Sequence, residues 1–377
     1  MAPTVGYDGK FLWSGHSFGS RSGHGVHARC LLKEMIECCP SAMFKVYVLD
    51  QDTGLDPRQN CEFIKLPRYA TNSILRNLIA YPAELMRSRI DVLLSFSTLP
   101  AYTPCRTILL LADLFWLANP GWLPRRIAVP RTFSIRNSVR RADVIITTTE
   151  FSRREIVRLL DVPFEKIAVV PHGIRDEFAA PVSSSDLSTA HGRYGIVRPY
   201  ILSLNDIHPR KNLEGLVQAF EHFKARTGLP HRLVIAGRNL WPYPEFYRCV
   251  ASSWFANDIS VLGYIPSNDV LALYRGADLY VYPSFYEGWG LQVHEAMMAG
   301  TPVAVSVNTS MSEIAGNAAD TFDPHNPDEM SRSMERILTD REFREMLVAR
   351  GFEQIKRYSW RNSAEATLAI CATLTSM

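Results

Sequence analysis

Apolar runs the length of short strands recur along the whole chain. In the first half they cover Pro3–Tyr7, Phe44–Leu49, Asp91–Phe96, Arg106–Leu111, Asp143–Thr148 and Ile167–Pro171. In the second half they cover Tyr200–Leu204, Arg232–Ala236, Ile259–Leu262, Asp278–Tyr282 and Pro302–Ser306. Several runs are almost continuously apolar, as strands buried on both faces of a parallel sheet tend to be. The runs therefore predict parallel strands in both halves.

Helical spacing of apolar residues separates many of these runs. It predicts helices over Val26–Ile36, Ser152–Leu160, Leu213–Thr227, Ser267–Arg275 and Leu291–Ala299. Strands that alternate with helices favour two doubly wound α/β domains. Ligands in such sheets bind outside the carboxyl ends of the strands, and a cleft between domains is a second favoured place.

The chain length and one biased segment set the predicted domain boundaries. At 377 residues the chain is longer than one typical domain. The stretch from about Asp176 to Arg193 is rich in Ser, Ala and Pro, which is typical of a linker. We place the linker at residues 179–197, the first domain at residues 1–178 and the second at residues 198–358.

Composition narrows the class of protein. With 47 % hydrophobic and 21 % charged residues the chain is globular, and its net charge of +3 gives no argument for nucleic acid as a partner. The seven cysteines show no C-x-x-C or zinc-finger spacing, which favours free thiols in a reducing compartment. No signal peptide is evident at the start, and the apolar stretch Thr107–Ala118 is too short to span a bilayer. We therefore expect a cytoplasmic protein.

The most informative motif follows the strand at Asp278–Tyr282. A turn with Glu287, Gly288, Trp289 and Gly290 leads into a helix that begins near Leu291 and carries Glu295. Glycines let backbone N–H groups approach a ligand, and a helix N-terminus favours an anionic group. The motif therefore suits a phosphate flanked by hydroxyl-rich groups, such as a nucleotide-sugar. The alternative is an ordinary strand–turn–helix unit, against which Trp289 between the glycines argues.

Two adjacent cations follow the first strand of the second half. Arg210 and Lys211 stand just before a predicted helix, where positive charge opposes the helix dipole. Neutralising a diphosphate explains them better than helix stability does, although a solvated basic pair is an alternative. Gly237 and the pair Tyr264 and Ile265 lie in strand-end turns that could border a base, or could be plain turns.

Three further features have plainer alternatives. His172 could touch a substrate or be a structural histidine. Asp50 and Asp52 form a D-x-D triplet, for which an acidic turn is the better interpretation, and no metal-ligand spacing occurs. Arginines interleave with apolar residues between Arg125 and Arg141, and such a surface can dock on anionic lipid heads or simply pack as a helix with solvent-facing arginines.

Taken together, these motifs resemble glycosyltransferase family 4, the group 1 nucleotide-sugar glycosyltransferases of the GT-B fold. The most specific part is the pair Glu287 and Glu295, in the family's E-x7-E pattern. The other matching motifs follow in the family's order: Arg210–Asn212, Gly263–Pro266, Tyr274–Asp278, Ser312–Ile314 and Phe322–Pro324. The resemblance implies two Rossmann-like domains facing each other across a cleft, with a C-terminal helix over residues 359–377 that joins the first domain.

The resemblance also implies roles for individual residues. Lys211 and Arg210 would hold the donor diphosphate, and Glu295 would bind the ribose hydroxyls. Glu287, with the backbone from Gly288 to Leu291, would hold the sugar and stabilise the departing phosphate. By the same resemblance, Gly23 and Gly25 would approach the phosphates. We further assign Gly237, Tyr264 and Ile265 to donor binding, and Asp113 and His172 to the acceptor and sugar side.

Family members retain anomeric configuration and usually need neither metal nor cofactor beyond the nucleotide-sugar. The pattern around Asp113 and Gly121–Pro124 looks most like that of mannosyltransferases, so we expect GDP-mannose as donor, with a UDP-sugar as the alternative. The expected acceptor is a glycan or lipid-linked molecule in surface polysaccharide or glycolipid synthesis. Peripheral contact with the inner face of the cell membrane would occur through the Arg125–Arg141 region.

Two residues depart from the family pattern. Ala112 stands where the family commonly has a histidine near the donor sugar, and Asp206 stands where many members place an arginine. Ala112 therefore leaves open a catalytically silent nucleotide-sugar binder. A dinucleotide-dependent oxidoreductase is a weaker alternative, because the loop with Gly23 and Gly25 has Ala28 where a third glycine is needed.

Overall fold

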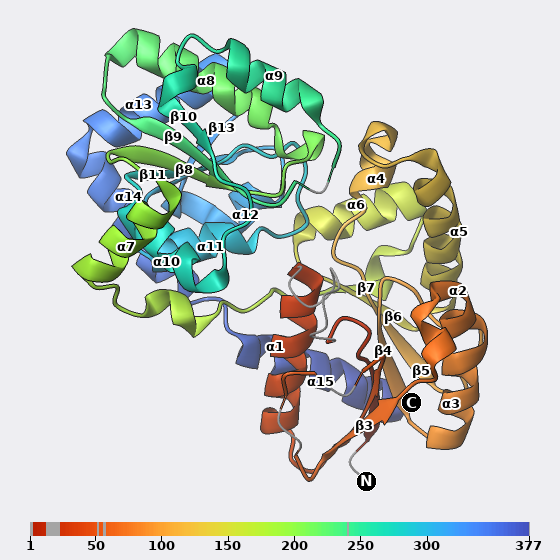
Figure 1. Cartoon of the computed structure of the whole chain (residues 1–377). Helices are drawn as coiled ribbons and strands as arrows, with labels where there is room; N and C mark the ends of the chain where they lie inside the picture. The colour runs from red at the N-terminus through yellow and green to blue at the C-terminus, as the bar shows by residue number, and fades with distance from the viewer. Residues whose placement is uncertain (1–2, 13–22, 51–52, 56–57, 240, 377) are drawn as a thin grey trace. The chain divides into compact units, whose positions relative to one another are not determined.

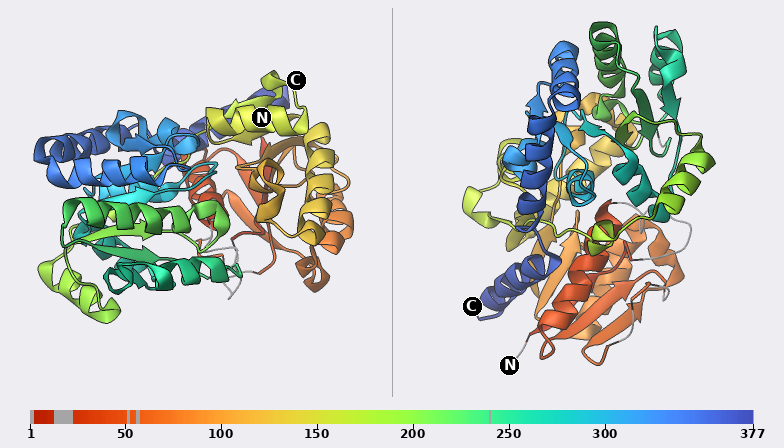
Figure 2. Two further views of the ribbon diagram at one scale, coloured as in Figure 1. Left: turned by 90° about the horizontal axis from the view of Figure 1, so that it is seen from above. Right: turned by 90° about the vertical axis from the view of Figure 1, so that its left-hand side faces the viewer.

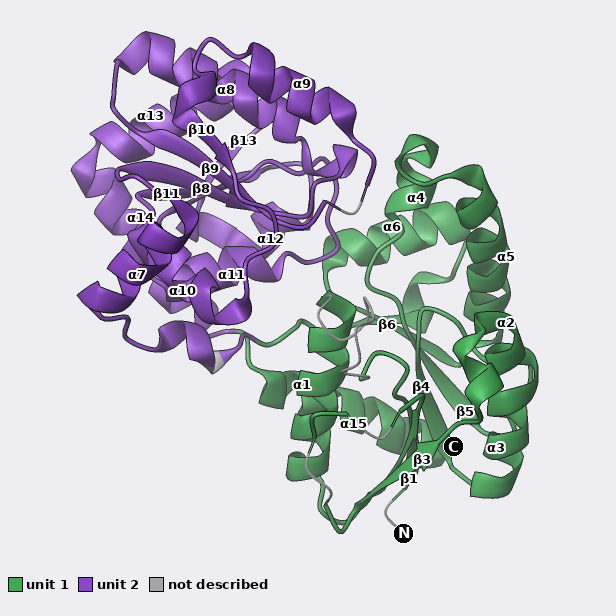
Figure 3. Cartoon of the chain, viewed as in Figure 1, with its two compact units in different colours: residues 1–173, 358–377 green, residues 174–357 purple. Residues whose placement is uncertain are grey.

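The computed structural model describes residues 3–12, 23–50, 53–55, 58–239 and 241–376 (Figure 1). It divides into two compact units, residues 1–173 with 358–377, and residues 174–357 (Figure 3). Each unit contains one parallel sheet with helices packed against it. The two sheets confirm the predicted doubly wound α/β class.

Unit 1 is built on a seven-stranded parallel sheet in the order β3-β2-β1-β4-β5-β6-β7. The strands are β1 (Thr4–Asp8), β2 (Met43–Val48), β3 (Cys61–Lys65), β4 (Val92–Phe96), β5 (Arg106–Leu110), β6 (Val144–Thr147) and β7 (Ile167–Val169). Its helices are α1 (Gly23–Cys38), α2 (Ser73–Leu75), α3 (Tyr81–Ser88), α4 (Phe115–Ala118), α5 (Arg125–Arg141), α6 (Glu150–Leu160) and α15 (Trp360–Ser376). The short edge strand β3 was not predicted from the sequence.

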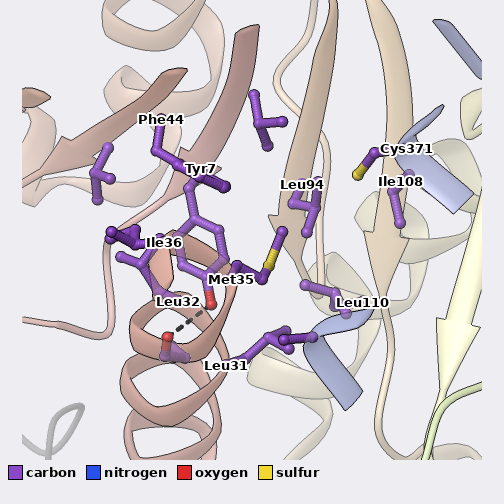
Figure 4. Close-up of a cluster of buried hydrophobic side chains, with 14 of the residues drawn as sticks. Tyr7, Leu31, Leu32, Met35, Ile36, Phe44, Leu94, Ile108, Leu110 and Cys371 are labelled. Carbon is purple, nitrogen blue, oxygen red and sulfur yellow. Dashed lines mark hydrogen bonds between the residues drawn. The ribbon is translucent and has the colours of Figure 1, made fainter. Parts of the chain in front are cut away.

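The C-terminal helix α15 belongs to unit 1 and packs along α1 (Figure 2). Cys371 and Leu374 of α15 share a hydrophobic core with Leu31 of α1 and the apolar face of the sheet. In the same core the hydroxyl of Tyr7 donates a 2.7 Å hydrogen bond to the main-chain oxygen of Ala28 (Figure 4). The last helix therefore completes the core of the first unit.

Unit 2 is built on a six-stranded parallel sheet in the order β10-β9-β8-β11-β12-β13. The strands are β8 (Tyr200–Leu204), β9 (Arg232–Ala236), β10 (Ile259–Val261), β11 (Leu279–Tyr282), β12 (Val303–Ser306) and β13 (Asp320–Phe322). The helices are α7 (Ser184–Tyr194), α8 (Leu213–Thr227), α9 (Pro244–Ser252), α10 (Ser267–Gly276), α11 (Leu291–Met298), α12 (Ser310–Ala315), α13 (Pro327–Thr339) and α14 (Arg341–Ile355).

The segment predicted to be a linker differs from that prediction. Residues 179–197 contain helix α7, which lies in unit 2 and packs on α10. The hydroxyl of Ser183 accepts a hydrogen bond from the N–H of Asp186 at its start, and Gly195 ends it with a φ of 62°. Ser- and Ala-rich composition does not distinguish a linker from a short helix with good caps.

Each sheet has one point where the strand order reverses. In unit 1 this point lies between β1 and β4, and in unit 2 it lies between β8 and β11. Connections run in opposite directions from such a point, which opens a crevice at the carboxyl ends of the two strands. The residues that follow β1, β4, β8 and β11 are therefore the first places to look for function.

Candidate active site

Arg210 and Lys211 are brought together with Glu287 at the switch point of unit 2. The two cations lie in a short 3-10 helix, η6 (Pro209–Lys211), that follows β8, and Glu287 lies in the loop after β11. The main-chain N–H of Phe285 donates to the main-chain oxygen of Arg210 at 2.9 Å, which ties the two loops to each other. Two segments about 75 residues apart in sequence thus form one polar cluster.

The three side chains form a compact ion cluster. Glu287 Oε1 lies 2.5 Å from Lys211 Nζ and 2.6 Å from Arg210 Nη1. Lys211 Nζ also donates to the hydroxyl of Tyr282 at 2.9 Å, and Arg210 Nη1 donates to the main-chain oxygen of Tyr286 at 2.7 Å. Lys211 and Glu287 are both buried, so the cluster combines two cations with one carboxylate away from bulk water.

Burial and neighbouring charge set the ionisation of this cluster. Burial alone would raise the pKa of Glu287, but Arg210 and Lys211 outweigh it and hold the pKa at about 2. Burial lowers the pKa of Lys211, an effect that Glu287 opposes. Glu287 is therefore ionised at neutral pH, and it can accept hydrogen bonds but has no proton to donate.

Glu295 has a separate set of partners on helix α11. Its Oε1 lies 2.7 Å from Arg175 Nη2, and its Oε2 accepts a 3.3 Å hydrogen bond from the hydroxyl of Tyr274. Burial raises the pKa of Glu295, and Arg175 opposes that rise. The two glutamates of the E-x7-E pattern are thus held in place by different cations.

The turn between the two glutamates has a defined backbone. Gly290, which precedes α11, has a φ of 110°, and a Cβ there would approach Met311 Cε to 2.5 Å. Trp289 is buried, with its ring centroid 5.5 Å from that of His294. The hydroxyl of Ser310, at the start of α12, donates to the main-chain oxygens of Glu287 at 2.8 Å and Trp289 at 3.1 Å. These contacts fix Gly288 to Leu291 at the helix start.

The turns after β9 and β10 lie next to each other. The N–H of Gly237 donates to the main-chain oxygen of Gly263 at 2.7 Å, and a Cβ on Gly237 would lie 1.8 Å from the main-chain oxygen of Asn205. Tyr264 is exposed, whereas Ile265 is buried. The backbone at Gly237 therefore leaves no room for a larger residue.

Asp206, which departs from the family pattern, forms a bidentate ion pair. Its carboxylate accepts hydrogen bonds from Arg238 Nε at 2.9 Å and Nη2 at 2.8 Å. The hydrogen bonds and the charge of Asp206 raise the pKa of Arg238. Many family members have an arginine at the position of Asp206. In this chain, Asp206 instead binds the arginine at position 238.

The predicted site residues of unit 1 fall in different surroundings. The sequence predicts Gly23 and Gly25 in a loop, whereas the structure places both in the first turn of α1. Gly23 is exposed and Gly25 is buried. Asp113 follows β5 and is half-buried, close enough to Arg131 to influence its pKa.

His172 is buried in a cluster of rings. Its ring centroid lies 4.0 Å from that of His27 and 5.4 Å from that of Trp360. Burial lowers the pKa of the neighbouring His27 to about 3. These contacts favour the structural interpretation of His172.

The described residues contain no group of three or more His, Cys, Asp or Glu side chains placed to hold a metal ion. Asp50 of the D-x-D triplet lies 3.1 Å from Lys65 Nζ, and Asp52 lies outside the described residues. An ion pair with Lys65 agrees with the acidic turn that the sequence favoured.

The arginine-rich region forms helix α5, and its arginines do not all face solvent. Arg125, Arg126 and Arg140 are exposed, whereas the guanidinium of Arg131 lies 3.8 Å from the ring centroid of Trp116. Val129 and Phe133 are 65 % and 77 % exposed. Helix α5 therefore presents apolar side chains beside cations. Within the described chain, no helix combines the length and apolar character needed to cross a bilayer.

Sequence reasoning missed the residues that hold the two glutamates. Arg175 was assigned to the end of the first domain, and Tyr274, Tyr282 and Ser310 were given no role. Arg175 is 120 positions from Glu295, so only the fold brings the two together. One feature of the sequence could have pointed to polar contacts at this strand: the tyrosines Tyr280 and Tyr282 alternate in a strand that is otherwise apolar.

Comparisons with known families cover most of the chain. The family described as glycosyl transferases group 1 matches residues 194–354, and the one described as glycosyltransferase family 4 matches residues 22–178. O-antigen chain mannosyltransferase B of Escherichia coli is 32 % identical over 264 residues, which are 70 % of this chain and 69 % of that protein. The serotype-specific mannosyltransferase WbdA of Escherichia coli is 29 % identical over 60 % of this chain, a match that spans 28 % of the longer protein.

Solved structures share the fold at low sequence identity. Sucrose-phosphate synthase from Thermosynechococcus elongatus superposes with a TM-score of 0.78 at 17 % identity, covering 99 % of both chains. WaaG, a glycosyltransferase involved in lipopolysaccharide biosynthesis, superposes with a TM-score of 0.70 at 15 % identity, covering 97 % of this chain and 99 % of that chain. At such identities the likeness concerns the fold alone.

Proposed function

This chain belongs to the family 4 glycosyltransferases of the GT-B fold, and from that premise we propose that it transfers mannose from GDP-mannose to a hydroxyl group with retention of anomeric configuration. The acceptor in this proposal is a glycan or a lipid-linked molecule of surface polysaccharide or glycolipid synthesis. The observation that carries the proposal is the cluster of Arg210, Lys211 and Glu287 at the switch point of unit 2.

The cluster has the charges that departure of a nucleoside diphosphate requires. When the bond between the anomeric carbon and the diphosphate breaks, negative charge grows on the leaving oxygen. Lys211 and Arg210 are already positioned, so they can stabilise that charge without rearranging. The backbone N–H groups at the start of α11, which follows Gly290, would add the positive end of a helix dipole to these two cations. The acceptor hydroxyl would then attack the same face of the sugar that the diphosphate leaves, and its proton would pass to the departing phosphate oxygen.

The two glutamates would act as hydrogen-bond acceptors in this scheme. Glu287, with a pKa of about 2, is ionised and can accept from sugar hydroxyls while it orients Lys211. Glu295 would accept from the ribose hydroxyls, with Arg175 and Tyr274 holding its carboxylate. Neither role needs a metal ion, so we expect a chelator to leave the rate unchanged.

The mannosyl group is favoured by the relatives. O-antigen chain mannosyltransferase B is 32 % identical, and WbdA is also described as a mannosyltransferase. Gly237 and Tyr264 would border the base, beside the pair of Asp206 and Arg238. A UDP-sugar is the alternative donor for the same fold.

A panel of nucleotide-sugars tests the proposal. The protein is incubated with GDP-mannose, UDP-glucose and ADP-glucose, and release of nucleoside diphosphate is measured. The proposal expects GDP to be released fastest, with the anomeric configuration of the product, read by NMR, the same as that of the donor. Faster UDP release would support the alternative donor. Binding without release from any donor would favour the silent binder to which Ala112 points.

Helix α5 would bring the enzyme to a membrane that holds the acceptor. Phe133 and Val129 can enter the headgroup region while Arg125 and Arg126 face anionic lipids. Arg131 is excluded from this surface because it stacks on Trp116. Attachment of this kind weakens as salt screens the arginines.

A further inference from the structure

Helix α12 anchors the turn between Glu287 and α11. Ser310, the first residue of α12, is fully buried, and its hydroxyl reaches two main-chain oxygens of that turn. It lies 2.8 Å from the oxygen of Glu287 and 3.1 Å from the oxygen of Trp289. Both oxygens belong to the loop after β11, outside any regular helix or strand. A side chain from another segment therefore sets the direction of two peptide groups in the turn.

The hydrogen bond to Trp289 determines where the N–H of Gly290 points. In a trans peptide group the C=O and N–H bonds point in opposite directions, so an oxygen turned towards Ser310 turns the following N–H away from it. Among the described residues, the N–H groups of Gly290 and Leu291 have no hydrogen-bond partner. Gly290 is half-buried, which leaves this part of the turn within reach of a ligand.

Helix α12 is also held at the end opposite Ser310. The main-chain oxygen of Ile314 accepts a 2.9 Å hydrogen bond from Gln354 Nε2 of α14, and His294 Nε2 lies 3.1 Å from the same oxygen. Burial lowers the pKa of His294 to about 4, so its ring is neutral at pH 7, and Nε2 donates because a carbonyl oxygen can only accept. Ser310 therefore stands on a fixed support, as a side chain that orients a catalytic group must.

We propose that Ser310 is a positioning residue for the transfer reaction. Its hydroxyl holds the peptide group between Trp289 and Gly290 so that the N–H of Gly290 donates to the terminal phosphate of the departing nucleoside diphosphate. An N–H that is already oriented stabilises the charge that grows on this phosphate without a cost of reorganisation. The inference rests on the proposed function, since it takes the turn after β11 to face the leaving group.

Binding of nucleoside phosphates to the full chain tests the proposal without turnover. Titration calorimetry compares GDP with GMP, which lacks the terminal phosphate, in the wild type and in Ser310→Ala. We expect Ser310→Ala to weaken GDP binding about tenfold, the usual effect of losing one hydrogen bond to a charged group, and to leave GMP binding unchanged. If the nucleotide-sugar panel selects a UDP-sugar, UDP and UMP replace this pair of probes.

Two other variants separate positioning from general damage to α12. Ser312→Ala is the matched control, because the hydroxyl of Ser312 also donates to two main-chain oxygens, those of Val307 at 2.9 Å and Thr309 at 3.2 Å. This variant should bind GDP like the wild type. Ser310→Cys keeps a small side chain with a weak donor, so its affinity for GDP should lie between those of the wild type and Ser310→Ala. It carries the test if Ser310→Ala does not fold.

Equal losses of GDP and GMP affinity in Ser310→Ala would show a structural role alone and would overturn the proposal. Unchanged GDP binding in Ser310→Ala, or an equal loss in Ser312→Ala, would overturn it as well. Nucleoside diphosphate release by the wild type is measured separately. A chain that binds GDP through this contact but releases none from a nucleotide-sugar would refute the proposed reaction and leave the role of Ser310 in phosphate binding intact.

Discussion

Lys211 Nζ lies 2.5 Å from Glu287 Oε1, and this buried ion pair joins the segments that follow the two strands of the switch point in unit 2. Taking both groups out of water is costly, and Arg210 and Tyr282 contribute the further contacts that offset this cost. The pair therefore fixes the position of an ammonium group where a diphosphate would bind. Its removal should affect stability and activity in ways that can be measured separately.

Glu287→Gln should lower the stability of the chain. The amide keeps the shape of the side chain but leaves Lys211 and Arg210 without their carboxylate, a change that costs about 3–5 kcal/mol for a buried pair. Urea unfolding followed by fluorescence measures the shift. Glu345→Gln, which removes the partner of Arg341 in an exposed pair of the same unit, should change the stability much less, because exposed ion pairs contribute little. Equal effects of the two substitutions would show that the buried pair is not specially important.

Acid should destabilise the wild-type chain partly through Glu287. Its pKa of about 2 is lower in the folded state than its ordinary value of 4.5, so its contribution is complete above pH 4.5 and is lost as the pH falls towards 2. Glu295 acts in the opposite direction, because burial raises its pKa. Urea midpoints between pH 5 and pH 3 should therefore fall less steeply in Glu287→Gln than in the wild type. A parallel pair of curves would contradict the assigned pKa shift.

Arg175→Ala should weaken donor binding without a comparable effect on the chemical step. Arg175 holds Glu295, and loss of a charged hydrogen bond of this kind raises the KM for the donor roughly tenfold, with kcat nearly unchanged. Glu177 is the matched control, since it pairs with the other nitrogen of Arg175 at 2.7 Å but is exposed. Glu177→Ala should leave the KM for the donor unchanged. If Arg175→Ala lowered kcat without raising the KM, Glu295 would not bind the ribose.

Gly290→Ala should disturb the turn that precedes α11. A φ of 110° is strained for alanine, and the added methyl group would approach Met311 Cε to 2.5 Å. We expect lower activity and a lower melting temperature. Gly192→Ala in α7 is the control, because nothing lies within 4 Å of the added Cβ and the change should stabilise the helix by about 0.5–1 kcal/mol. Full activity in Gly290→Ala would mean that the backbone from Gly288 to Leu291 is not critical.

Membrane attachment through α5 should depend on Phe133. Phe133→Glu replaces an exposed apolar side chain with a negative charge, so co-sedimentation with anionic liposomes at low salt should be lost. Trp254 of unit 2 is also exposed, at 92 %, and Trp254→Glu should pellet like the wild type. Failure of the wild type to pellet, or equal pelleting of both variants, would remove α5 as the lipid contact.

Much of the fold could be predicted because local pattern determines it. Strands β8 and β9 and helix α8 occupy the residues at which apolar periodicity placed them. The edge strands β3 and β13 are short and partly polar, so no apolar run marks them. Helix α7 was missed because its serines and alanines resemble a linker, although Ser183 and Gly195 cap it.

The candidate site was predictable where the chemistry lies in one motif and not where it depends on tertiary contact. Recognisable motifs contain Glu287, Glu295, Arg210 and Lys211. The structure brings Glu287 together with Arg210 and Lys211. Arg175 and Ser310 act on those motifs from distant segments, and one sequence gives no sign of such pairing.

The rate of nucleoside diphosphate release by Lys211→Ala tests the central claim most directly. With the donor that the nucleotide-sugar panel selects, we predict a fall of about 10²–10³-fold relative to the wild type, the usual effect of removing one group that stabilises transition-state charge. Lys356→Ala, which removes an exposed lysine of the same unit, should keep the wild-type rate. An undiminished rate in Lys211→Ala, with the chain folded, would contradict the assignment of the leaving-group site to Lys211, Arg210 and Glu287.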